Sequence, residues 1–545
     1  MAIAAYNGLA FIVNGKSDGN SIGDAGTQIM SGMIGGLLHP QAQTMFVIGL
    51  GTGESAGWLA QLPDARRVDV AELEPALDEM ARRCAPVNHD VLLHPKVHRI
   101  YNDAREVLLT SPQRYDLIVS EPSNPYRSGI AGLFTREFYR AGRDRLNAGG
   151  LFIQWLQGYE VDEQTVATVC ATLHSVYAHV EIWQTNQIDL LLVASTEPIH
   201  YSAAVLQQRI RQEPFRSAMA CAWRASDLAG LLARYLGGLP LVEDYARRRW
   251  ARINTDDRNW IEYGFARTVG RQTGFTILDL RERAVALGAH RPPLEPGAVD
   301  WESVQCQRRA MLAFSEQQVP PAESPTPLQQ AYGKVLERYL AHDWPGVTTA
   351  WESMPREPQD ATELALLAYA FAQQGDNRAM PLVERLRLFQ RTEAEAIRGI
   401  LLWRRHEFTE SAAALATSFE RLRQDPWPWL DIVHGATAAA VSVAAAAPAE
   451  APRLLAAVRA PFALDCEGSR GEIALSIAPM VSPEAAAECL AALEPHVLWT
   501  ETFLRARRKI YLDAHHPLLA RARRDLDEYL QSAADEAMEA GHDRP

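Results

Sequence analysis

Short apolar runs alternate with amphipathic segments of helix length through roughly the first 200 residues. This alternation is typical of a doubly wound, largely parallel sheet with helices on both faces. Only the polar residues 184–189 separate the last two runs, so we expect these to pair antiparallel, as a hairpin at one edge of the sheet. The predicted strands are residues 45–48, 68–72, 97–101, 117–120, 151–155, 179–183 and 190–194.

Beyond this region the pattern predicts mainly helices. Three segments, at residues 342–344, 375–377 and 406–408, each read as a turn followed by a helix. Their spacings of about 33 and 31 residues are typical of a helix-hairpin repeat of the tetratricopeptide (TPR) kind, with an unrelated helical bundle as the alternative. The expected order is a strand–turn lead-in over 1–40, an α/β domain over 41–200, a helical extension over 201–290, a linker over 291–327 and a TPR-like helical domain over 328–545.

Composition narrows the class of protein. The formal charge of −13 includes charges of both signs and no long basic stripe, which argues against a nucleic-acid partner. The Ala-rich run over 435–448 is short and ends in proline, so a packed helix is expected there rather than a membrane span. We therefore expect a soluble, cytoplasmic protein. The cysteines lack metal or disulfide spacing and are expected to be reduced thiols: Cys84, Cys170, Cys221, Cys306, Cys466 and Cys489.

Candidate cofactor-binding residues follow three consecutive predicted strands. Glycines in a turn between strand and helix let the backbone approach a ligand, and the helix presents free N–H groups to it. A carboxylate ending the second strand suits ribose hydroxyls, and an acid after the third suits the adenine amine. A nicotinamide dinucleotide is the competing ligand, and helix capping is the structural alternative for the acids. The residues are Gly49, Gly51 and Gly53, then Glu72, then Asn102 and Asp103.

These motifs resemble those of the spermidine synthase family. The likeness covers about residues 10–200, and it is closest to a bacterial spermidine synthase-like subgroup with a C-terminal helical-repeat extension. It implies a class I S-adenosylmethionine-dependent methyltransferase-like, Rossmann-like fold. The motifs that carry it are residues 13–18, the glycine turn, residues 71–74, 102–105, 120–125, 133–139 and 254–258.

The acceptor side departs from the family pattern. Glu121 and Asn124 stand where the resemblance implies two aspartates, the second of which takes a proton from the attacking amine. An amide has no basic lone pair at neutral pH, so Asn124 can orient a nucleophile but cannot deprotonate it. Glu121 is therefore the candidate acid and Asn124 the candidate positioning residue. The remaining candidates for substrate binding are Asp18, Asp24, Gln28, Gln154, Gln157 and Tyr159.

The resemblance implies a transferase of polyamine biosynthesis. Its co-substrate is decarboxylated S-adenosylmethionine or S-adenosylmethionine, with no metal, and its acceptor is a small-molecule amine. A methyltransferase on the same scaffold is the second interpretation. A catalytically silent nucleotide sensor, with a helical array that binds a protein partner, is the third. The sequence leaves open whether two copies of the chain form a homodimer. The segment at 254–258 is expected either to fold over the pocket or to cap a helix through Thr255 or Asp256.

Overall fold

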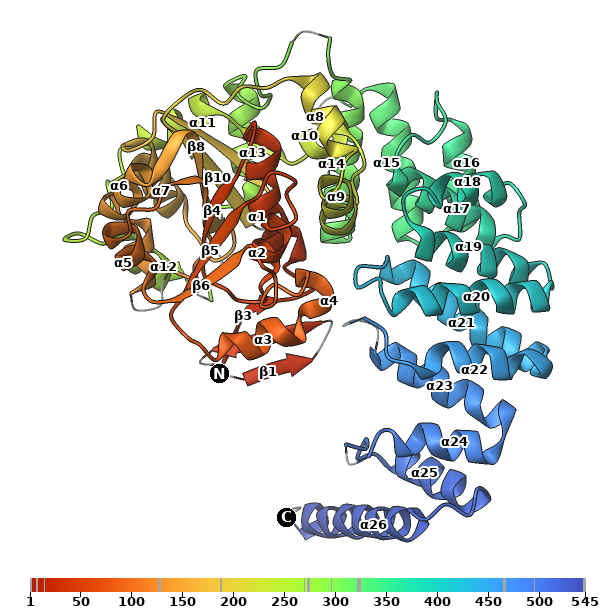
Figure 1. The fold of residues 1–545 in the computed structure, drawn as a ribbon. Coiled ribbons are helices and arrows are strands. Elements are labelled where there is room, and N and C mark those ends of the chain that lie inside the picture. The colour runs from red at the N-terminus through yellow and green to blue at the C-terminus, as the bar shows by residue number, and fades with distance from the viewer. Residues whose placement is uncertain are drawn as a thin grey trace. The chain divides into compact units, whose positions relative to one another are not determined.

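The computed structural model describes residues 2–5, 8–13, 15–125, 129–186, 189–268, 270–271, 275–295, 297–320, 325–463, 467–494 and 496–542. The chain divides into two compact units, residues 1–367 and 368–545. Unit 1 contains both sheets of the described chain, and unit 2 is built of helices (Figure 1).

The larger sheet of unit 1 has the topology of the methyltransferase-like fold. Its strands β4 to β8 run parallel and reach one edge of the sheet at β6, and β10 lies antiparallel between β8 and β9. The strand order is β11-β9-β10-β8-β7-β4-β5-β6. The bounds are β4 (Thr44–Ile48), β5 (Arg67–Glu72), β6 (Val97–Tyr101), β7 (Tyr115–Ser120), β8 (Leu146–Gln157), β9 (His179–Gln184), β10 (Asp189–Ser195) and β11 (Tyr235–Gly237).

The predicted strands are confirmed, and one detail of the hairpin is corrected. The pair β9 and β10 is antiparallel as predicted, but it does not form the edge of the sheet. The short strand β11, which comes from the helical extension, pairs antiparallel with β9 on its outer side. A three-residue strand between helices has too little alternation to be recognised from its pattern.

Helices cover both faces of the sheet, so its strands, apart from the edge strand β6, are largely buried on both sides. One face packs against α1 and α2, and α8 and α9 pack against α1. The other face packs against α5, α6, α7, α11 and α13, with an aromatic cluster that includes Phe138, Phe152 and Tyr177. The bounds are α1 (Ala25–Leu38), α2 (Glu54–Leu59), α5 (Ala104–Thr110), α6 (Arg136–Asp144), α7 (Glu163–His174), α8 (Ala203–Ile210), α9 (Phe215–Trp223), α11 (Leu239–Ala246) and α13 (Ile277–Ala286).

The N-terminal lead-in forms a small antiparallel sheet of β1 (Ala2–Ala5), β2 (Leu9–Val13) and β3 (Lys16–Asn20). Its expected turn is present at Gly15, which has a left-handed φ of 81°, while Asn14 lies outside the described residues. The remaining short elements of unit 1 are α3 (Leu77–Arg83), α4 (Ala85–Asn88), the 3-10 helix η1 (Ile130–Phe134), α10 (Leu228–Leu232) and α12 (Trp260–Thr268).

The linker expected over 291–327 needs correction. Residues 301–316 form α14 (Trp301–Glu316), which begins at the side-chain cap of Asp300. Val304, Ala310 and Ala313 of this helix are buried, and α14 packs against α10 and α15 (Pro327–Leu340). Proline-containing segments flank the helix on both sides, which favoured a loop over the whole range. The predicted segment 321–324 lies outside the described residues.

The three related segments each form a turn between two helices. The turn residues His342, Gly375 and His406 have left-handed φ values of 53°, 69° and 62°, as helix C-caps commonly do. They join α15 to α16 (Trp344–Glu352), α17 (Ala361–Gln373) to α18 (Ala379–Leu386), and α19 (Arg391–Arg404) to α20 (Phe408–Leu422). The helix-hairpin pattern is confirmed, and the tetratricopeptide assignment stays a prediction.

Unit 2 continues with α21 (Leu430–Ala446), η2 (Pro448–Glu450), α22 (Ala451–Arg459), α23 (Glu467–Val481), α24 (Pro483–Ala491), α25 (Glu501–Asp513) and α26 (Leu519–His542). By length and hydropathy, no single helix in the described parts of the chain qualifies as a membrane span. Residues 430–446 and 448–459 qualify only when taken together, and the chain bends by 120° between them.

The cysteines in the described residues are free thiols: Cys84, Cys170, Cys221, Cys306 and Cys489. Burial raises the pKa of the Cys84, Cys170 and Cys306 thiols to about 12. These three therefore stay protonated at neutral pH. Cys466 lies outside the described residues.

Candidate functional site

A cavity of about 680 Å³ lies at the carboxyl edge of the parallel strands in unit 1. This is where doubly wound sheets bind ligands, because the loops that follow the strands diverge there. The cavity wall follows the sheet order. Residues after β6 and β5 line one end, the turn after β4 lies centrally, and residues after β7 and β8 and at the start of β10 line the other end.

The glycine turn connects β4 to α2. Gly49, Gly51 and Gly53 have left-handed φ values of 94°, 51° and 82°, which side chains with a Cβ rarely adopt. Gly49 and Gly51 line the cavity, whereas Gly53 forms the N-cap of α2 and packs against Val91 and Asn88. The turn thus brings the glycine main chain, together with Leu50 and Thr52, to the cavity.

Glu72 and Asp103 both line the cavity and both hold main-chain N–H groups. Glu72 Oε2 accepts from Leu50 N at 2.8 Å, and Oε1 accepts from Glu74 N at 2.9 Å. Asp103 Oδ1 caps α5 by accepting from Arg105 N at 2.7 Å. Asp103 is therefore a helix cap, whereas Glu72 holds N–H groups of two turns, and these bonds fix both carboxylates in place. A carboxylate has about four acceptor sites, so each keeps capacity for a ligand hydroxyl or amine.

Asn102 also lines the cavity, at its surface end. Its Oδ1 accepts from Asp103 N at 2.8 Å, which helps to set the turn after β6. Together with Glu72 and Asp103, this residue marks the end of the cavity that the sequence predicts for a nucleoside.

The loop after β7 places Glu121 and Asn124 in the cavity wall. Ser55 Oγ donates to Glu121 Oε2 at 2.7 Å, and Ser31 Oγ donates to the same oxygen at 3.1 Å. Burial raises the pKa of Glu121 to about 7, against the opposing effect of the two hydroxyls. Asn124 is buried and accepts at Oδ1 from the Tyr159 hydroxyl at 3.1 Å. The predicted acid, amide and phenol therefore meet at one end of the cavity.

The candidate substrate-binding residues from the N-terminal part of the chain also line the cavity. Asp18 accepts from Ser123 Oγ at 3.0 Å, and Asp24 accepts from Asn20 N at 2.7 Å. Asp24 thus has a turn-stabilising role as well as a place in the cavity wall, and burial raises its pKa. Gln28 is buried and accepts from the Thr52 hydroxyl at the glycine turn. Asp18, Asp24 and Gln28 all line the cavity.

Gln154 and Gln157 are not brought to the cavity. Both are fully buried on β8 and are absent from the residues that line it. Gln154 Nε2 donates to Trp155 O at 3.0 Å, and Gln157 Nε2 donates to Tyr159 O at 2.9 Å. Because both faces of this strand are covered, polar residues along it do not indicate an exposed rim.

Asp189 and Arg105 line the cavity and were not predicted to do so. Asp189 begins β10 and is only 7% exposed, and Thr27 Oγ1 donates to its Oδ2 at 2.9 Å. A carboxylate at the first position of a wholly apolar strand was a signal for a special role. Arg105 is the second residue of α5, which follows Asp103. From the sequence alone, an arginine at this position is expected on the protein surface.

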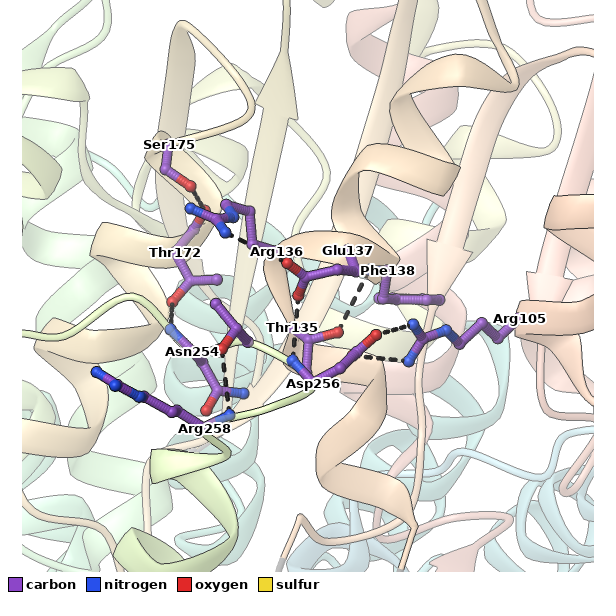
Figure 2. A network of polar contacts seen from close by, with 11 residues as sticks. Arg105, Thr135, Arg136, Glu137, Phe138, Thr172, Ser175, Asn254, Asp256 and Arg258 are labelled. Atoms are coloured by element: carbon purple, nitrogen blue, oxygen red, sulfur yellow. Dashed lines mark hydrogen bonds and ion pairs between the residues drawn. The ribbon is translucent and has the colours of Figure 1, made fainter.

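The motif at residues 254–258 forms a tight turn, with a bridge between Thr255 and Arg258 (Figure 2). Asn254 is fully buried. Its Nδ2 donates to Phe134 O at 3.2 Å, and its main-chain N donates to Thr172 Oγ1 at 2.9 Å. Its main-chain O accepts from Arg136 N at 2.9 Å. The turn therefore ties the start of α6 to α7. Asn254 Oδ1 also accepts from Ile261 N in the first turn of α12 at 3.2 Å, so the bond to a helix N-terminus comes from Asn254 rather than from Thr255 or Asp256, and none of residues 254–258 lines the cavity.

Asp256 in the same turn forms an ion pair with Arg105 at the cavity wall. Its two oxygens accept from two nitrogens of the Arg105 guanidinium, one of them at 2.9 Å, and its main-chain N donates to Glu137 Oε2 at 3.1 Å. This forked pairing raises the pKa of Arg105 and lowers the pKa of Asp256. The turn thus holds the guanidinium at the nucleoside end of the cavity.

The cavity is strongly acidic. Among the described residues that line it are six carboxylates and one cationic side chain, Arg105, which Asp256 already neutralises. No group of three His, Cys, Asp or Glu side chains in the described parts of the chain is arranged to hold a metal ion. The six carboxylates are those of Asp18, Asp24, Glu72, Asp103, Glu121 and Asp189.

The strand order and the position of the cavity are those of a methyltransferase-like fold. Residues 26–191 match the family model described as the spermine/spermidine synthase domain, so this part of the chain is similar to that domain. The matched range contains the glycine turn, Glu72, Asp103, Glu121, Asn124 and Asp189.

Two curated proteins are similar to part of this chain. A polyamine aminopropyltransferase of Nitrosomonas europaea is 27% identical over 184 residues, which is 32% of this chain and 56% of the relative. A thermospermine synthase of Arabidopsis thaliana is 23% identical over 151 residues, 27% of this chain and 44% of the relative. The chain spans about half the length of these relatives.

Two solved structures are similar to parts of unit 1. A spermidine synthase from Thermotoga maritima is 17% identical and covers 35% of this chain and 66% of its own, with a TM-score of 0.33. Human methyltransferase-like protein 13 in complex with SAH is 16% identical and covers 37% of this chain and 92% of its own, with a TM-score of 0.28.

Proposed function

We propose that the chain transfers the aminopropyl group of decarboxylated S-adenosylmethionine to an amine acceptor. The charge of the cavity carries this proposal. The amino-acid tail of intact S-adenosylmethionine ends in a carboxylate as well as an ammonium group, and a carboxylate needs a cationic or N–H-rich partner. The charged residues that line the cavity beyond the glycine turn are all acidic, and Arg105 is paired at the other end. This surrounding suits a tail that carries only an ammonium group.

In this proposal, the nucleoside half of the donor binds to the residues that the sequence predicts for it. Asp103 accepts the adenine amine and Glu72 accepts the ribose hydroxyls, while the main chain at Gly49 and Gly51 passes close to the sugar and sulfur. The N–H groups that these carboxylates already hold keep them in position before the ligand arrives, which lowers the cost of ordering them on binding.

The reaction is a displacement at carbon. The acceptor nitrogen attacks the aminopropyl carbon bonded to sulfur, the C–S bond breaks with its electron pair remaining on sulfur, and neutral methylthioadenosine leaves. The nitrogen loses a proton, and Glu121 takes it. A pKa of about 7 matches a general base that works near neutral pH, and the Ser31 and Ser55 hydroxyls fix its carboxylate.

Asn124 positions the nucleophile rather than activating it. The Tyr159 hydroxyl donates to its Oδ1 and so fixes the orientation of the amide. Alignment of nucleophile, carbon and sulfur, with water excluded, then supplies much of the rate enhancement, because the sulfonium is already a good leaving group.

The experiment has a donor part and an acceptor part. In the donor part, Glu72→Gln weakens methylthioadenosine binding about tenfold or more in calorimetry, because a charge-assisted hydrogen bond is lost. The matched control is Glu74→Gln, two residues further on, where the carboxylate is exposed and lies outside the cavity lining. Equal effects of the two variants would contradict the assigned nucleoside site.

In the acceptor part, methylthioadenosine release is measured with decarboxylated donor and a panel of amines. Glu121→Gln removes most of the turnover, by about 10²-fold or more, and leaves methylthioadenosine binding nearly intact. Asn124→Asp raises activity toward simple diamines, because it restores a second base. If neither wild type nor Asn124→Asp uses any amine while S-adenosylmethionine binds tightly, the methyltransferase or sensor interpretation replaces this proposal.

A further inference from the structure

Unit 1 contains a second cavity, of about 270 Å³, outside the site described above. Its wall comes from the loop after β9, the end of α9, the segment between α10 and β11, and α14, together with parts of α15 and α17. Among the described residues, only Asn186 lines both cavities. Small-molecule sites commonly measure about 300–1,000 Å³, so this cavity has room for a small ligand.

The guanidinium of Arg234 lines the second cavity. Its Nη1 donates to the main-chain O of Thr185 at 2.7 Å, and its Cζ lies 5.1 Å from the centroid of the Trp223 ring. The ring is fixed in turn, because Trp223 Nε1 donates to Gly26 O at 3.0 Å. A guanidinium has five N–H donors, and the described residues accept from one nitrogen of Arg234. Its other nitrogens therefore keep their donors for a ligand.

Two further buried arginines near Arg234 also lack an acidic partner. Arg281 Nη2 donates to Gln184 Oε1 at 2.6 Å, while its Nη1 is buried and donates to no described residue. Arg308 donates to main-chain carbonyls between residues 232 and 235. Burial lowers the pKa of Arg234 to about 9 and that of Arg281 to about 10, so both stay cationic at neutral pH. Buried charge without a counter-charge is costly, and an anion would offset that cost.

The carboxyl group in the described wall of this cavity, Asp360, does not form an ion pair with Arg234. Its Oδ1 accepts from Glu363 N at 2.9 Å at the start of α17, and Glu363 pairs with Arg356. Burial raises the pKa of Asp360 well above its usual range, and the Glu363 carboxylate adds to this effect. A negative charge on Asp360 is therefore disfavoured, and the positive charge of Arg234 is left for a ligand to neutralise.

The rest of the wall favours an organic anion over an inorganic one. Met311 and Phe314 of α14 line the cavity, as do Trp223 and Tyr332. Apolar and aromatic side chains around a few polar groups are typical of sites for small organic molecules. A planar guanidinium matches the two oxygens of a carboxylate.

We propose that the second cavity binds a small organic carboxylate. Both oxygens of the carboxylate accept from Arg234, and the apolar body of the ligand packs against Met311 and Phe314. The inference is independent of the proposed function, because Arg234 does not line the first cavity.

The test uses benzoate as the carboxylate and benzamide as a neutral molecule of nearly the same shape. Calorimetry on the full-length protein should show benzoate binding at least about tenfold more tightly than benzamide. Arg234→Gln removes the charge and should lower benzoate affinity about tenfold or more. The matched control is Arg216→Gln on α9, where the arginine is exposed, pairs with Glu213 and lies outside the cavity wall. Its benzoate affinity should stay within about twofold of wild type.

Four results overturn the inference: no benzoate binding to wild type, equal affinities for benzoate and benzamide, an unchanged benzoate affinity in Arg234→Gln, or an equal loss in Arg216→Gln. Inorganic phosphate is the further arm. If it binds as tightly as benzoate, the apolar wall takes no part and the site is not one for organic carboxylates.

A second variant covers the case in which Arg234→Gln does not fold, as checked by urea denaturation. Met311→Trp keeps the guanidinium and fills part of the cavity with a larger side chain. Loss of benzoate binding in this folded variant supports the site, and an unchanged affinity places benzoate elsewhere and overturns the inference.

Discussion

Three carboxyl groups of unit 1 have pKa values raised to about 7, in each case mainly by burial. Glu121 and Asp189 line the cavity, so a ligand changes their protonation. Glu181 does not, and it accepts from Trp183 Nε1 at 2.9 Å and from the Tyr201 hydroxyl inside the fold. The same shift therefore has a binding consequence at two sites and only a stability consequence at the third.

Glu181→Gln tests the stability consequence. The carboxyl is protonated in the folded protein up to about pH 7 but ionised in the unfolded chain above its ordinary pKa of about 4.5. The folded state therefore holds more protons between these values, and the free energy of unfolding falls as pH rises through that range. The full effect is about 3 kcal/mol. Urea denaturation at pH 5 and pH 8 should show a clearly smaller loss of stability in the variant than in wild type.

A matched control for this variant is Glu197→Gln, an exposed carboxylate just after β10. Its unfolding free energy should follow that of wild type at both pH values. Equal pH dependence in wild type and Glu181→Gln would contradict the assignment of a buried, neutral Glu181.

For carboxylates that follow parallel strands, a place in the cavity could be predicted from the sequence, residue by residue. Glu72, Asp103 and Glu121 each stand at the carboxyl end of a clear apolar run, and the topology then brings them to one cavity. Asp189 begins an antiparallel strand, so its end of the strand meets the same edge only because β10 inserts between β8 and β9. That insertion is a long-range pairing, which local patterns do not specify.

At the scale of elements, the turn at residues 254–258 links three helices around the nucleoside end of the cavity. Asn254 ties the start of α6 to α7, and Asp256 holds Arg105 on α5. The polar composition of the motif predicted a segment that folds over the pocket or caps a helix. Its partners lie 82 to 151 residues earlier in the chain, so the role of the motif depends on the tertiary fold.

Asp256→Asn tests whether the turn supports the cavity. The freed guanidinium of Arg105 has Glu137 and Asp103 as its nearest other carboxylates. Pairing with Asp103 would compete with the adenine amine, so methylthioadenosine affinity should fall about threefold to tenfold in calorimetry. The unfolding free energy should change by less than about 1 kcal/mol, because the ion pair is partly exposed.

Asp257→Asn is the control, since this exposed neighbour lies outside the cavity lining. It should leave both affinity and stability unchanged. A loss of affinity in Asp257→Asn equal to that in Asp256→Asn would mean that the turn acts through its net charge and not through Arg105.

At the scale of the whole molecule, unit 2 has a core of its own. Its helices pack as successive pairs, among them α19 with α20 and α25 with α26. Arg507 is fully buried and pairs with Glu494 and Asp525, so even its one deeply buried charge near the C-terminus is neutralised inside the unit. Helix pairs with turns were predictable from spacing, whereas the boundary between the units, which lies within α17, was expected at residue 328. A continuous helix gives no break in the pattern at which to place a boundary.

A fragment of residues 354–545 should fold alone, with a strongly helical circular dichroism spectrum and one cooperative urea transition. This fragment keeps the start of α17, where Asp360 Oδ1 accepts from Glu363 N at 2.9 Å and Arg356 pairs with the buried Glu363. A matched fragment of residues 368–545 begins inside α17 and lacks these groups. Loss of a helix cap costs about 0.5–2 kcal/mol, so its urea midpoint should be lower while its helix content stays high. If residues 354–545 show helix but no cooperative transition, unit 2 needs unit 1 for its tertiary packing, and the division of the chain into two independently folding units is wrong.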